Sequence, residues 1–285
     1  MKAAWISECG TPDVIQFGDQ PRPEAGPGKV LVRTAAVAVN PIDVYIRSGS
    51  VGAKLPSPYI IGSDVAGTVE AVGEAVTRFA VGDRVWGSNQ GLAGRQGTFA
   101  EYCCTDEYWL YPTPDNVTDE QAAAGALTGI TAHLGLHLHA NLQTGDVVFV
   151  NGGTGGVGSA VIQISKAAGA TVISTAGGEE KCELARQLGA DAVINYRTQN
   201  VPQAITDLRP ELGAVTVWFE TLRNPQPETT FPRWLSSSLH SDGWPGRRPI
   251  SPSDRFTWMI CEPSDLQRST PHRWNRTRLP MASTT

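Results

Sequence analysis

The stretch that most constrains the fold is residues 147–169, VVFVNGGTGGVGSAVIQISKAAG, where an apolar run meets a cluster of glycines. The run VVFV is continuous, as in a strand buried on both faces of a parallel sheet. The next residues fit G-x-G-x-x-G and lead into an apolar helical stripe. Glycines let a backbone turn tightly and approach a diphosphate at a helix N-terminus. A bare glycine-rich connection is the alternative, but the flanking strand and helix favour dinucleotide binding. The candidate cofactor-binding residues are Gly153, Gly155, Gly156, Val157 and Gly158.

Strand and helix patterns keep alternating after this loop. ATVISTAG, DAVINYR and AVTVWFETL are typical of strands, and EEKCELARQLGA is typical of a helix. The repetition predicts a parallel sheet with right-handed crossovers, in the order 3-2-1-4-5-6, of which four strands are visible. A helix is expected to begin after Thr118, with Gln121 completing a capping box. We therefore assign residues 119–222 to a Rossmann nucleotide-binding domain, truncated after its fourth strand.

The end of the second predicted strand indicates which dinucleotide is bound. An NAD site usually places an acid there to bind the ribose hydroxyls. Here the strand ends Ser174-Thr175-Ala176-Gly177, without a carboxylate, and Lys181 lies one turn into the next helix. Hydroxyls beside a cation suit a 2′-phosphate, which favours NADPH. A solvated helix lysine is the alternative interpretation of Lys181.

The first 118 residues have a different pattern. GKVLVRTAAVAVN is typical of a strand that ends at Asn40-Pro41, where a favoured cap and a favoured first helical residue predict a short helix over NPIDVYIRSG. Short β-rich runs separated by glycines follow from residue 59 to residue 106. This pattern predicts a compact, strongly bent antiparallel β-domain over residues 1–118.

Composition excludes several classes of protein. The chain has 285 residues and a net charge of −5, so neither nucleic acid nor an anionic membrane surface is an expected partner. No apolar run is long enough for a signal peptide or a membrane span. Five cysteines without a C-x-x-C pair make a disulfide framework improbable, and the expected location is cytoplasmic.

The chain changes character near residue 222. Residues 223–285 contain nine Arg, no Lys, nine of the 20 prolines, four of the eight tryptophans and two of the 30 glycines. They lack a sustained period of 2 or 3.6, which argues against long helices and central strands. A disordered tail is one interpretation, although four tryptophans argue against it. Translation in a shifted reading frame is the interpretation that we favour.

Seven motifs together resemble a known family, over about residues 1–222. They are, in order, NPIDVYIRSG, IIGSDVAGTVEAVG, VGDRV, GTFAEY, LTGITA, NGGTGGVG and EEKCELARQLGADAVINYR. The resemblance is to the zinc-free NADPH:quinone oxidoreductases, the zeta-crystallin-like branch of the medium-chain dehydrogenases/reductases. It implies a GroES-like β-domain, a Rossmann domain and an active site in the cleft between them.

The resemblance also implies roles for individual residues. Ser174, Lys181 and Tyr196 match residues around the 2′-phosphate of NADPH, and Thr128 matches a residue near the cofactor. Asn40 and Tyr45 match residues that line the nicotinamide and substrate pocket. As candidate catalytic residues, Asn40 would hydrogen-bond the nicotinamide or the substrate carbonyl. Tyr45 would orient or protonate the developing oxygen, a proton that water could equally supply.

No metal is expected. Zinc-dependent relatives place Cys where this chain has Asn40, and His-Glu where it has Ser63-Asp64; a four-cysteine lobe is also missing from NQGLAGRQG. His133 and His137 are four residues apart and are interpreted as surface histidines.

Simpler interpretations compete with these roles. Asn40 could be only a helix cap, and Tyr45 only a packed aromatic. Asp43 and Arg47, at i and i+4, are expected to pair on the helix surface.

Three classes of function remain. The first is an NADPH-dependent reductase of quinones or conjugated enones. The second is a non-catalytic NADPH-binding protein, as lens crystallins of this branch are, and the third is an inactive truncated family member. The resemblance suggests a homodimer, but strand six commonly forms the dimer contact and is not visible. We expect poor stability and weak or absent activity, because strand four would be an exposed apolar edge.

Overall fold

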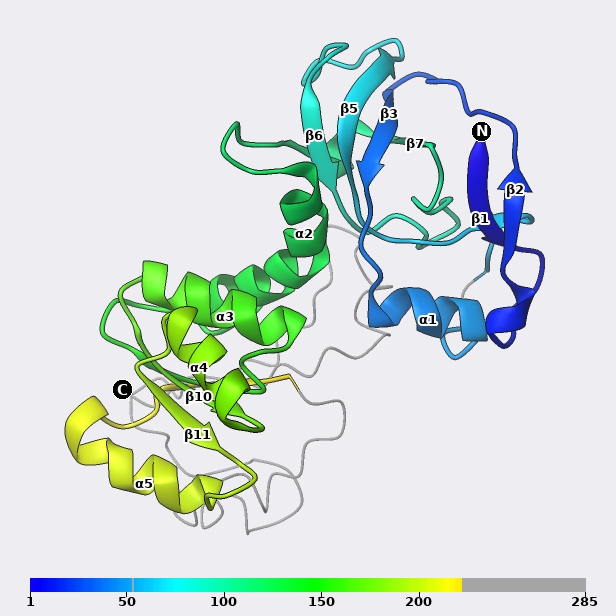
Figure 1. Cartoon of the computed structure of the whole chain (residues 1–285). Helices are drawn as coiled ribbons and strands as arrows, with labels where there is room; N and C mark the ends of the chain where they lie inside the picture. Colours follow the sequence, from blue (N-terminus) through cyan, green and yellow to red (C-terminus); the bar gives the residue numbers. More distant parts are fainter. Residues whose placement is uncertain (53, 222–285) are drawn as a thin grey trace, which may run out of the picture. The chain divides into compact units, whose positions relative to one another are not determined.

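The computed structural model describes residues 1–52 and 54–221, and these fall into two compact units, Met1–Tyr111 and 112–221. Figure 1 shows the first unit in blue to green and the second in green to yellow. The expected change of character after residue 222, including its interpretation as a frameshift or a disordered tail, lies outside the described residues.

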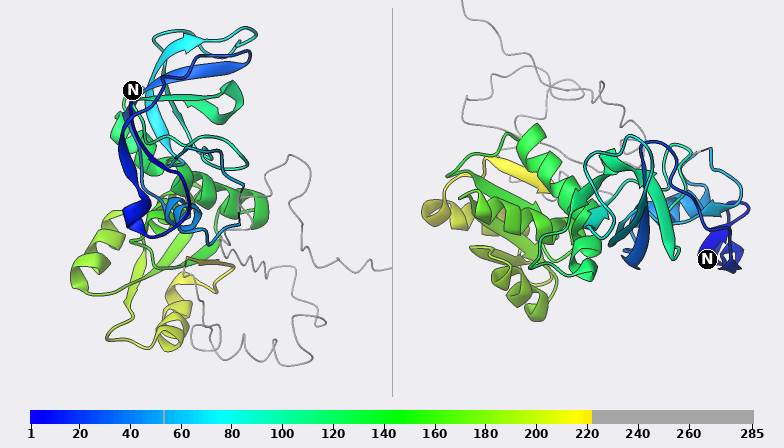
Figure 2. Two further views of the ribbon diagram at one scale, coloured as in Figure 1. Left: turned by 90° about the vertical axis from the view of Figure 1, so that its right-hand side faces the viewer. Right: turned by 90° about the horizontal axis from the view of Figure 1, so that it is seen from above.

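The first unit is built from antiparallel strands. A three-stranded sheet has the order β2-β1-β4, and a five-stranded sheet has the order β7-β3-β5-β6-β8. The strands are β1 (Lys2–Ile6), β2 (Gln16–Asp19), β3 (Lys29–Ala36), β4 (Tyr59–Ile60), β5 (Val65–Val72), β6 (Arg84–Gly87), β7 (Tyr102–Asp106) and β8 (Leu110–Pro112). Both views in Figure 2 show the dark-blue β1–β2 pair beside the N-terminus.

The core of this unit explains why the short strands form. Val30 and Val32 of β3 pack with Val65 and Val69 of β5 in one buried apolar cluster. The β3–β5 ladder has two register shifts, and a side chain at Gly67 would collide with the Arg33 carbonyl of β3. The absent Cβ therefore lets two backbones approach where the sheet bends. This confirms the strongly bent β-domain that the glycine spacing predicts.

Helix α1 (Pro41–Ser48) begins and ends where the sequence predicts. Asn40 is the extended residue before it, Pro41 is its first residue, and Gly49 closes it with a φ of 77°. Glycine suits that left-handed conformation. Ile42 and Ile46 face the interior of the unit, and Asp43 lies buried with them. The unit also contains two short 3₁₀ turns, Pro12–Val14 and Glu107–Trp109.

The second unit is a parallel sheet in the order β11-β10-β9-β12, which is the predicted order 3-2-1-4. The strands are β9 (Val147–Asn151), β10 (Thr171–Ala176), β11 (Ala192–Asn195) and β12 (Val217–Glu220). The helices are α2 (Asp119–His133), α3 (Gly156–Ala167), α4 (Glu179–Gln187) and α5 (Val201–Leu212), and residues Leu134–His139 extend α2 as a π-helix. Helix α5 was not predicted from the sequence.

Alternate residues of β9 serve opposite faces of this sheet. Val148 and Val150 belong to a core cluster with residues of α2 and α3, and Val147 and Phe149 belong to a second cluster with residues of α5. Figure 1 accordingly shows α5 across the strands from α3 and α4. All five β9 residues are buried, which confirms the interpretation of VVFV.

The start of α2 confirms its predicted cap. The Thr118 hydroxyl accepts from the Gln121 amide at 3.2 Å, and the Gln121 side chain accepts from the Thr118 amide at 3.0 Å. Strands five and six would follow β12 and lie outside the described residues, so the expectations for dimerisation and for an exposed edge remain predictions. Among residues 1–52 and 54–221, no helix combines the length and the apolar character that a membrane span needs.

Candidate functional site

The glycine loop joins β9 to α3 in a sharp turn. Gly152 has a φ of 79°, and Gly155 is the extended residue that precedes the helix. A side chain at Gly153 would collide with the Ser174 hydroxyl, and one at Gly158 would collide with the Gly152 carbonyl. These two glycines are thus required by close packing of the turn itself.

Gly155 differs from the other motif glycines. Its backbone adopts ordinary angles, with φ −75°, and a Cβ there would lie 3.4 Å from the Gly152 carbonyl oxygen. A side chain therefore fits the fold at residue 155, but it would project into the space in front of the helix. At Gly156 a Cβ would lie 2.9 Å from the Thr128 Cγ2, so Thr128 of α2 packs against the loop.

The first turn of α3 leaves backbone donors without partners in the helix. The first α-helical hydrogen bond runs from the Ser159 amide to the Gly155 carbonyl, at 2.9 Å. The amides of Gly156, Val157 and Gly158 precede it, and such orphan N–H groups carry the positive end of the helix dipole. This end of α3 is suited to an anion.

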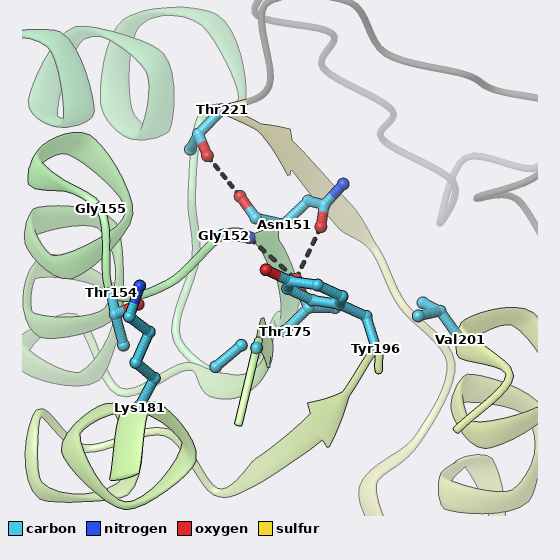
Figure 3. Close-up of a pocket in the computed structure, with 11 residues that line it drawn as sticks. Asn151, Gly152, Thr154, Gly155, Thr175, Lys181, Tyr196, Val201 and Thr221 are labelled. Atoms are coloured by element: carbon cyan, nitrogen blue, oxygen red, sulfur yellow. Dashed lines mark hydrogen bonds between the residues drawn. The ribbon is translucent and has the colours of Figure 1, made fainter. Parts of the chain in front are cut away.

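A cavity of about 630 Å³ opens at the carboxyl ends of β9, β10 and β12 (Figure 3). Ligands bind at this edge of open parallel sheets as a rule. Among residues 1–52 and 54–221, the lining contains one cation, Lys181, and no acid, which favours an anionic ligand. The lining residues are Asn151, Gly152, Thr154, Gly155, Thr175, Ala176, Gly177, Lys181, Tyr196, Val201 and Thr221.

The structure brings three of the predicted site residues together around this cavity: Gly155, Lys181 and Tyr196. The Tyr196 hydroxyl lies directly against Gly177, where a Cβ would collide with it. Ser174, predicted beside them, is fully buried under Gly153 and does not belong to the lining. Its neighbour Thr175 does.

Several lining residues were not singled out as site residues from the sequence. Asn151, Thr175 and Thr221 all stand at strand ends, and that position is the signal that could have indicated them. Arg197 is a further cation nearby, since its Nε lies 3.2 Å from where a Cβ of Gly177 would be. It lies two residues after the end of β11 and is exposed.

Hydrogen bonds tie these strand ends to the glycine loop. The Gly152 amide donates to the Thr175 hydroxyl at 2.9 Å, and that hydroxyl donates to the Asn151 side-chain oxygen at 2.6 Å. The Asn151 amide nitrogen donates to the Glu220 carboxylate at 3.1 Å. The Thr221 hydroxyl donates to the Asn151 carbonyl. Figure 3 draws the bonds among Gly152, Thr175, Asn151 and Thr221 as dashed lines.

The predicted catalytic residue Asn40 lies in a buried polar network of the first unit. Its side-chain nitrogen donates to the Asp64 carboxylate at 2.8 Å, and the Ser88 hydroxyl donates to the other Asp64 oxygen at 2.5 Å. The sequence places Asn40, Ser63 and Asp64 where zinc-dependent relatives carry metal ligands, and the structure brings these three residues into one cluster. Tyr45 of α1 is half-buried.

Asp43 corrects one expectation. It does not pair with Arg47: Asp43 is 2% exposed, and it accepts from the Ser63 hydroxyl at 2.6 Å and from the Asn40 amide at 2.7 Å. Arg47 donates to the Gly10 carbonyl instead. The expected pairing is wrong because Asp43 shares the inward face of α1 with Ile42 and Ile46.

Burial makes the Asp43 carboxyl a weaker acid than usual. Loss of hydration raises the pKa of its carboxyl to about 6, against the lowering effect of the bonds from Ser63 and Asn40, and the nearby Asp64 adds a smaller upward contribution.

The remaining candidate groups have no such network. The exposed rings of His133 and His137 contact each other at a tilt of 53°, with centroids 4.6 Å apart. Within the described ranges, no group of three or more His, Cys, Asp or Glu side chains is arranged to hold a metal ion. Cys103 is buried, and burial raises the pKa of its thiol to about 12, as expected for strand packing.

Comparison with known proteins identifies the class that this fold and site belong to. The alcohol dehydrogenase GroES-like domain family matches residues 26–115, and the zinc-binding dehydrogenase family matches residues 156–229. These are the two domain families of medium-chain dehydrogenases/reductases.

Individual relatives narrow the class. Human quinone oxidoreductase is 36% identical over 225 residues, which are 79% of this chain and 67% of the relative. The chloroplastic NADPH-dependent alkenal/one oxidoreductase of Arabidopsis thaliana is 38% identical and is covered to 54%. The crystal structure of Escherichia coli quinone oxidoreductase complexed with NADPH superposes with a TM-score of 0.68 at 26% identity, covering 81% of this chain and 68% of that one.

The chain belongs to the quinone oxidoreductase branch of the medium-chain dehydrogenase/reductase superfamily. It spans about two thirds of the length of the human and bacterial enzymes.

Proposed function

We propose that the chain is a zinc-independent, NADPH-dependent reductase that delivers hydride to a quinone or a conjugated enone. The observation that carries the proposal is the cavity at the carboxyl ends of the strands, which is lined by Lys181 and by Gly155, the residue directly before α3. The names of the relatives agree: two are quinone oxidoreductases, one of them solved with NADPH, and a third is an NADPH-dependent alkenal/one oxidoreductase.

The described residues fit a phosphorylated dinucleotide. The amides of Gly156, Val157 and Gly158 would hold the diphosphate, and Gly155 leaves it room because a side chain there would occupy the approach. Lys181 and Tyr196 would bind the 2′-phosphate, with Ser174 beneath them and Thr128 behind the loop. In the part of the chain that the structure describes, the lining contains no acid that would bind the ribose hydroxyls of NAD.

When bound, NADPH supplies the hydride, and the chain's own residues bind and orient the reactants. Asn40 and Tyr45 are proposed to act at the nicotinamide and the substrate. The Asn40 side-chain nitrogen donates to Asp64, which fixes the orientation of the Asn40 side chain. Tyr45 would orient the substrate oxygen or give it a proton.

Substitution of Gly155 tests the proposal without breaking the fold. Gly155→Asp puts a carboxylate where the diphosphate would lie, and Gly155→Ala is the matched control for the added Cβ. We expect Gly155→Asp to weaken NADPH binding at least 100-fold, because a fixed negative charge and added bulk would stand where the diphosphate would bind. Binding is measured by NADPH fluorescence, and turnover by NADPH oxidation with 9,10-phenanthrenequinone.

The outcomes separate the three classes of function. NADPH binding with turnover supports the reductase. Binding without turnover of any quinone or enone indicates the non-catalytic NADPH-binding protein. No stabilisation of the wild-type protein by NADPH in a thermal melt indicates an inactive family member. Equal NADPH affinity of wild type and Gly155→Asp would refute the proposed site.

A further inference from the structure

Two threonine hydroxyls hold the two ends of β9 in the same way. At the amino end, the Thr216 hydroxyl accepts from the Val147 amide at 3.0 Å and donates to the Asp146 carboxylate at 3.0 Å. At the carboxyl end, the Thr175 hydroxyl accepts from the Gly152 amide at 2.9 Å and donates to Asn151 at 2.6 Å. Thr175 and Asn151 line the cavity, whereas Thr216 and Asp146 do not belong to its lining.

The bonds at the carboxyl end form a chain with one direction. Because the Glu220 carboxylate only accepts, it fixes the Asn151 side chain with its nitrogen toward Glu220 and its oxygen toward Thr175. Thr175 must then donate to Asn151, and its lone pairs are left for the Gly152 amide. The side chains are shielded from water, with exposures of 3% for Glu220, 7% for Asn151 and 0% for Thr175.

This chain ends on the residue where the glycine loop turns. Gly152 has a left-handed φ, and its carbonyl lies where a Cβ of Gly158 would collide with it. A shift of Gly152, which itself lines the cavity, would therefore displace the first turn of α3. Buried, fully bonded chains of this kind hold a backbone in one arrangement.

We propose that Asn151 and Thr175 are positioning residues for the cofactor loop, and that Glu220 at the end of β12 sets their orientation. The proposal rests on the proposed function, because the loop is positioned for the diphosphate of NADPH. The Thr221 hydroxyl, bonded to the Asn151 carbonyl, strengthens the same link between β12 and the loop. None of these side chains needs to take part in hydride transfer.

Thr175→Val removes the hydroxyl and keeps the shape of the side chain, and Thr216→Val makes the same change at the other end of β9. Thr175→Val removes both buried hydrogen bonds of the hydroxyl, and we expect it to weaken NADPH binding about tenfold because the loop is no longer held in one arrangement. It should also speed amide hydrogen exchange of residues 152–158 in the ligand-free protein. Thr216→Val should lower the melting temperature similarly but leave the NADPH dissociation constant within about twofold.

Rescue separates positioning from general destabilisation. Thr175→Ser restores the hydroxyl and should return both the NADPH affinity and the slow exchange. Unchanged affinity and exchange in Thr175→Val, or equal weakening of NADPH binding by Thr216→Val, would overturn the inference. If the wild-type protein does not bind NADPH, the proposed function fails, and the exchange of residues 152–158 still decides whether Thr175 positions the loop.

Discussion

Each unit of the molecule holds an asparagine on a buried carboxylate, and the two pairs differ in what lies beyond them. Asn40 donates to Asp64 at 2.8 Å in the first unit, and Asn151 donates to Glu220 at 3.1 Å in the second. Around Asp64 and Asp43, all four carboxylate oxygens accept bonds from other side chains or from the backbone. The Asn151 chain instead ends on the Gly152 amide, at the edge of the cavity.

The comparison shows that the same arrangement, an asparagine bonded to a buried carboxylate, can have two different roles. The network around Asp43 and Asp64 affects mainly the stability of its own unit, because all four of its carboxylate oxygens are used within that unit. The chain of hydrogen bonds through Asn151 and Thr175 instead fixes the position of Gly152, which lines the cavity. Substitutions should therefore change unfolding in the first unit and cofactor affinity in the second.

Asp64→Ala tests the closed network with the largest expected effect. The substitution removes the carboxylate that accepts from the Asn40 side-chain nitrogen and from the Ser88 hydroxyl. We expect this loss to lower the free energy of unfolding by about 3 kcal/mol. Urea unfolding measures the change. Asp83→Ala is the control, because Asp83 accepts one backbone bond on an exposed surface. A loss below about 1 kcal/mol for Asp64→Ala would show that water replaces the network.

The raised pKa of Asp43 predicts a smaller, pH-dependent effect. Because its folded pKa is about 6 and its ordinary value is 3.8, the folded protein keeps a proton that the unfolded chain releases between about pH 4 and pH 6. The stabilising contribution of this carboxyl is therefore present below pH 4 and is lost as pH rises through 6, by on the order of 2–3 kcal/mol.

Asp43→Asn removes this titration and keeps groups that can bond Ser63 and the Asn40 amide. We expect the difference in unfolding free energy between wild type and Asp43→Asn to change between pH 4 and pH 7. Wild type should become less stable relative to Asp43→Asn as the pH rises. Carboxylates common to both proteins cancel in that difference. A pH-independent difference would mean that Asp43 titrates normally in the folded state.

Lys181→Ala is expected to have the smallest effect on the protein and a selective effect on the ligand. Lys181 is exposed, so its loss should leave unfolding unchanged, while NADPH affinity falls about tenfold and NADH affinity stays within twofold. Fluorescence titrations with both dinucleotides measure the selectivity, and Lys54→Ala in the first unit is the control for the removal of an exposed lysine. Equal losses for NADPH and NADH would place Lys181 away from the 2′-phosphate.

The fold was predictable where local pattern and packing agree. The run VVFV gave a strand with both faces buried, and Thr118 with Gln121 gave the start of α2. Helix α5 was missed because VPQAITDLRPEL contains two prolines, which a pattern analysis treats as breaks. Pro202 stands in the first turn, where its missing N–H costs nothing, and Pro210 lies in the last turn.

The site was only partly predictable, because burial of a polar residue is a tertiary property. Spacing alone put Asp43 with Arg47, and only the packing of α1 shows that Asp43 faces inward. In the same way, Asn151, Thr175 and Glu220 are far apart in sequence and meet because β9, β10 and β12 are neighbours. The glycine pattern located the loop but not the side chains that hold it.

Gly155 has a consequence for how relatives of this chain would diverge. Gly153 and Gly158 are demanded by the turn itself, whereas the backbone at Gly155 accepts any L-residue. A descendant that abandoned its coenzyme while keeping its architecture would lose nothing by substituting position 155. The residue at position 155 thus indicates whether a relative still binds the coenzyme. It does not depend on whether the relative still folds.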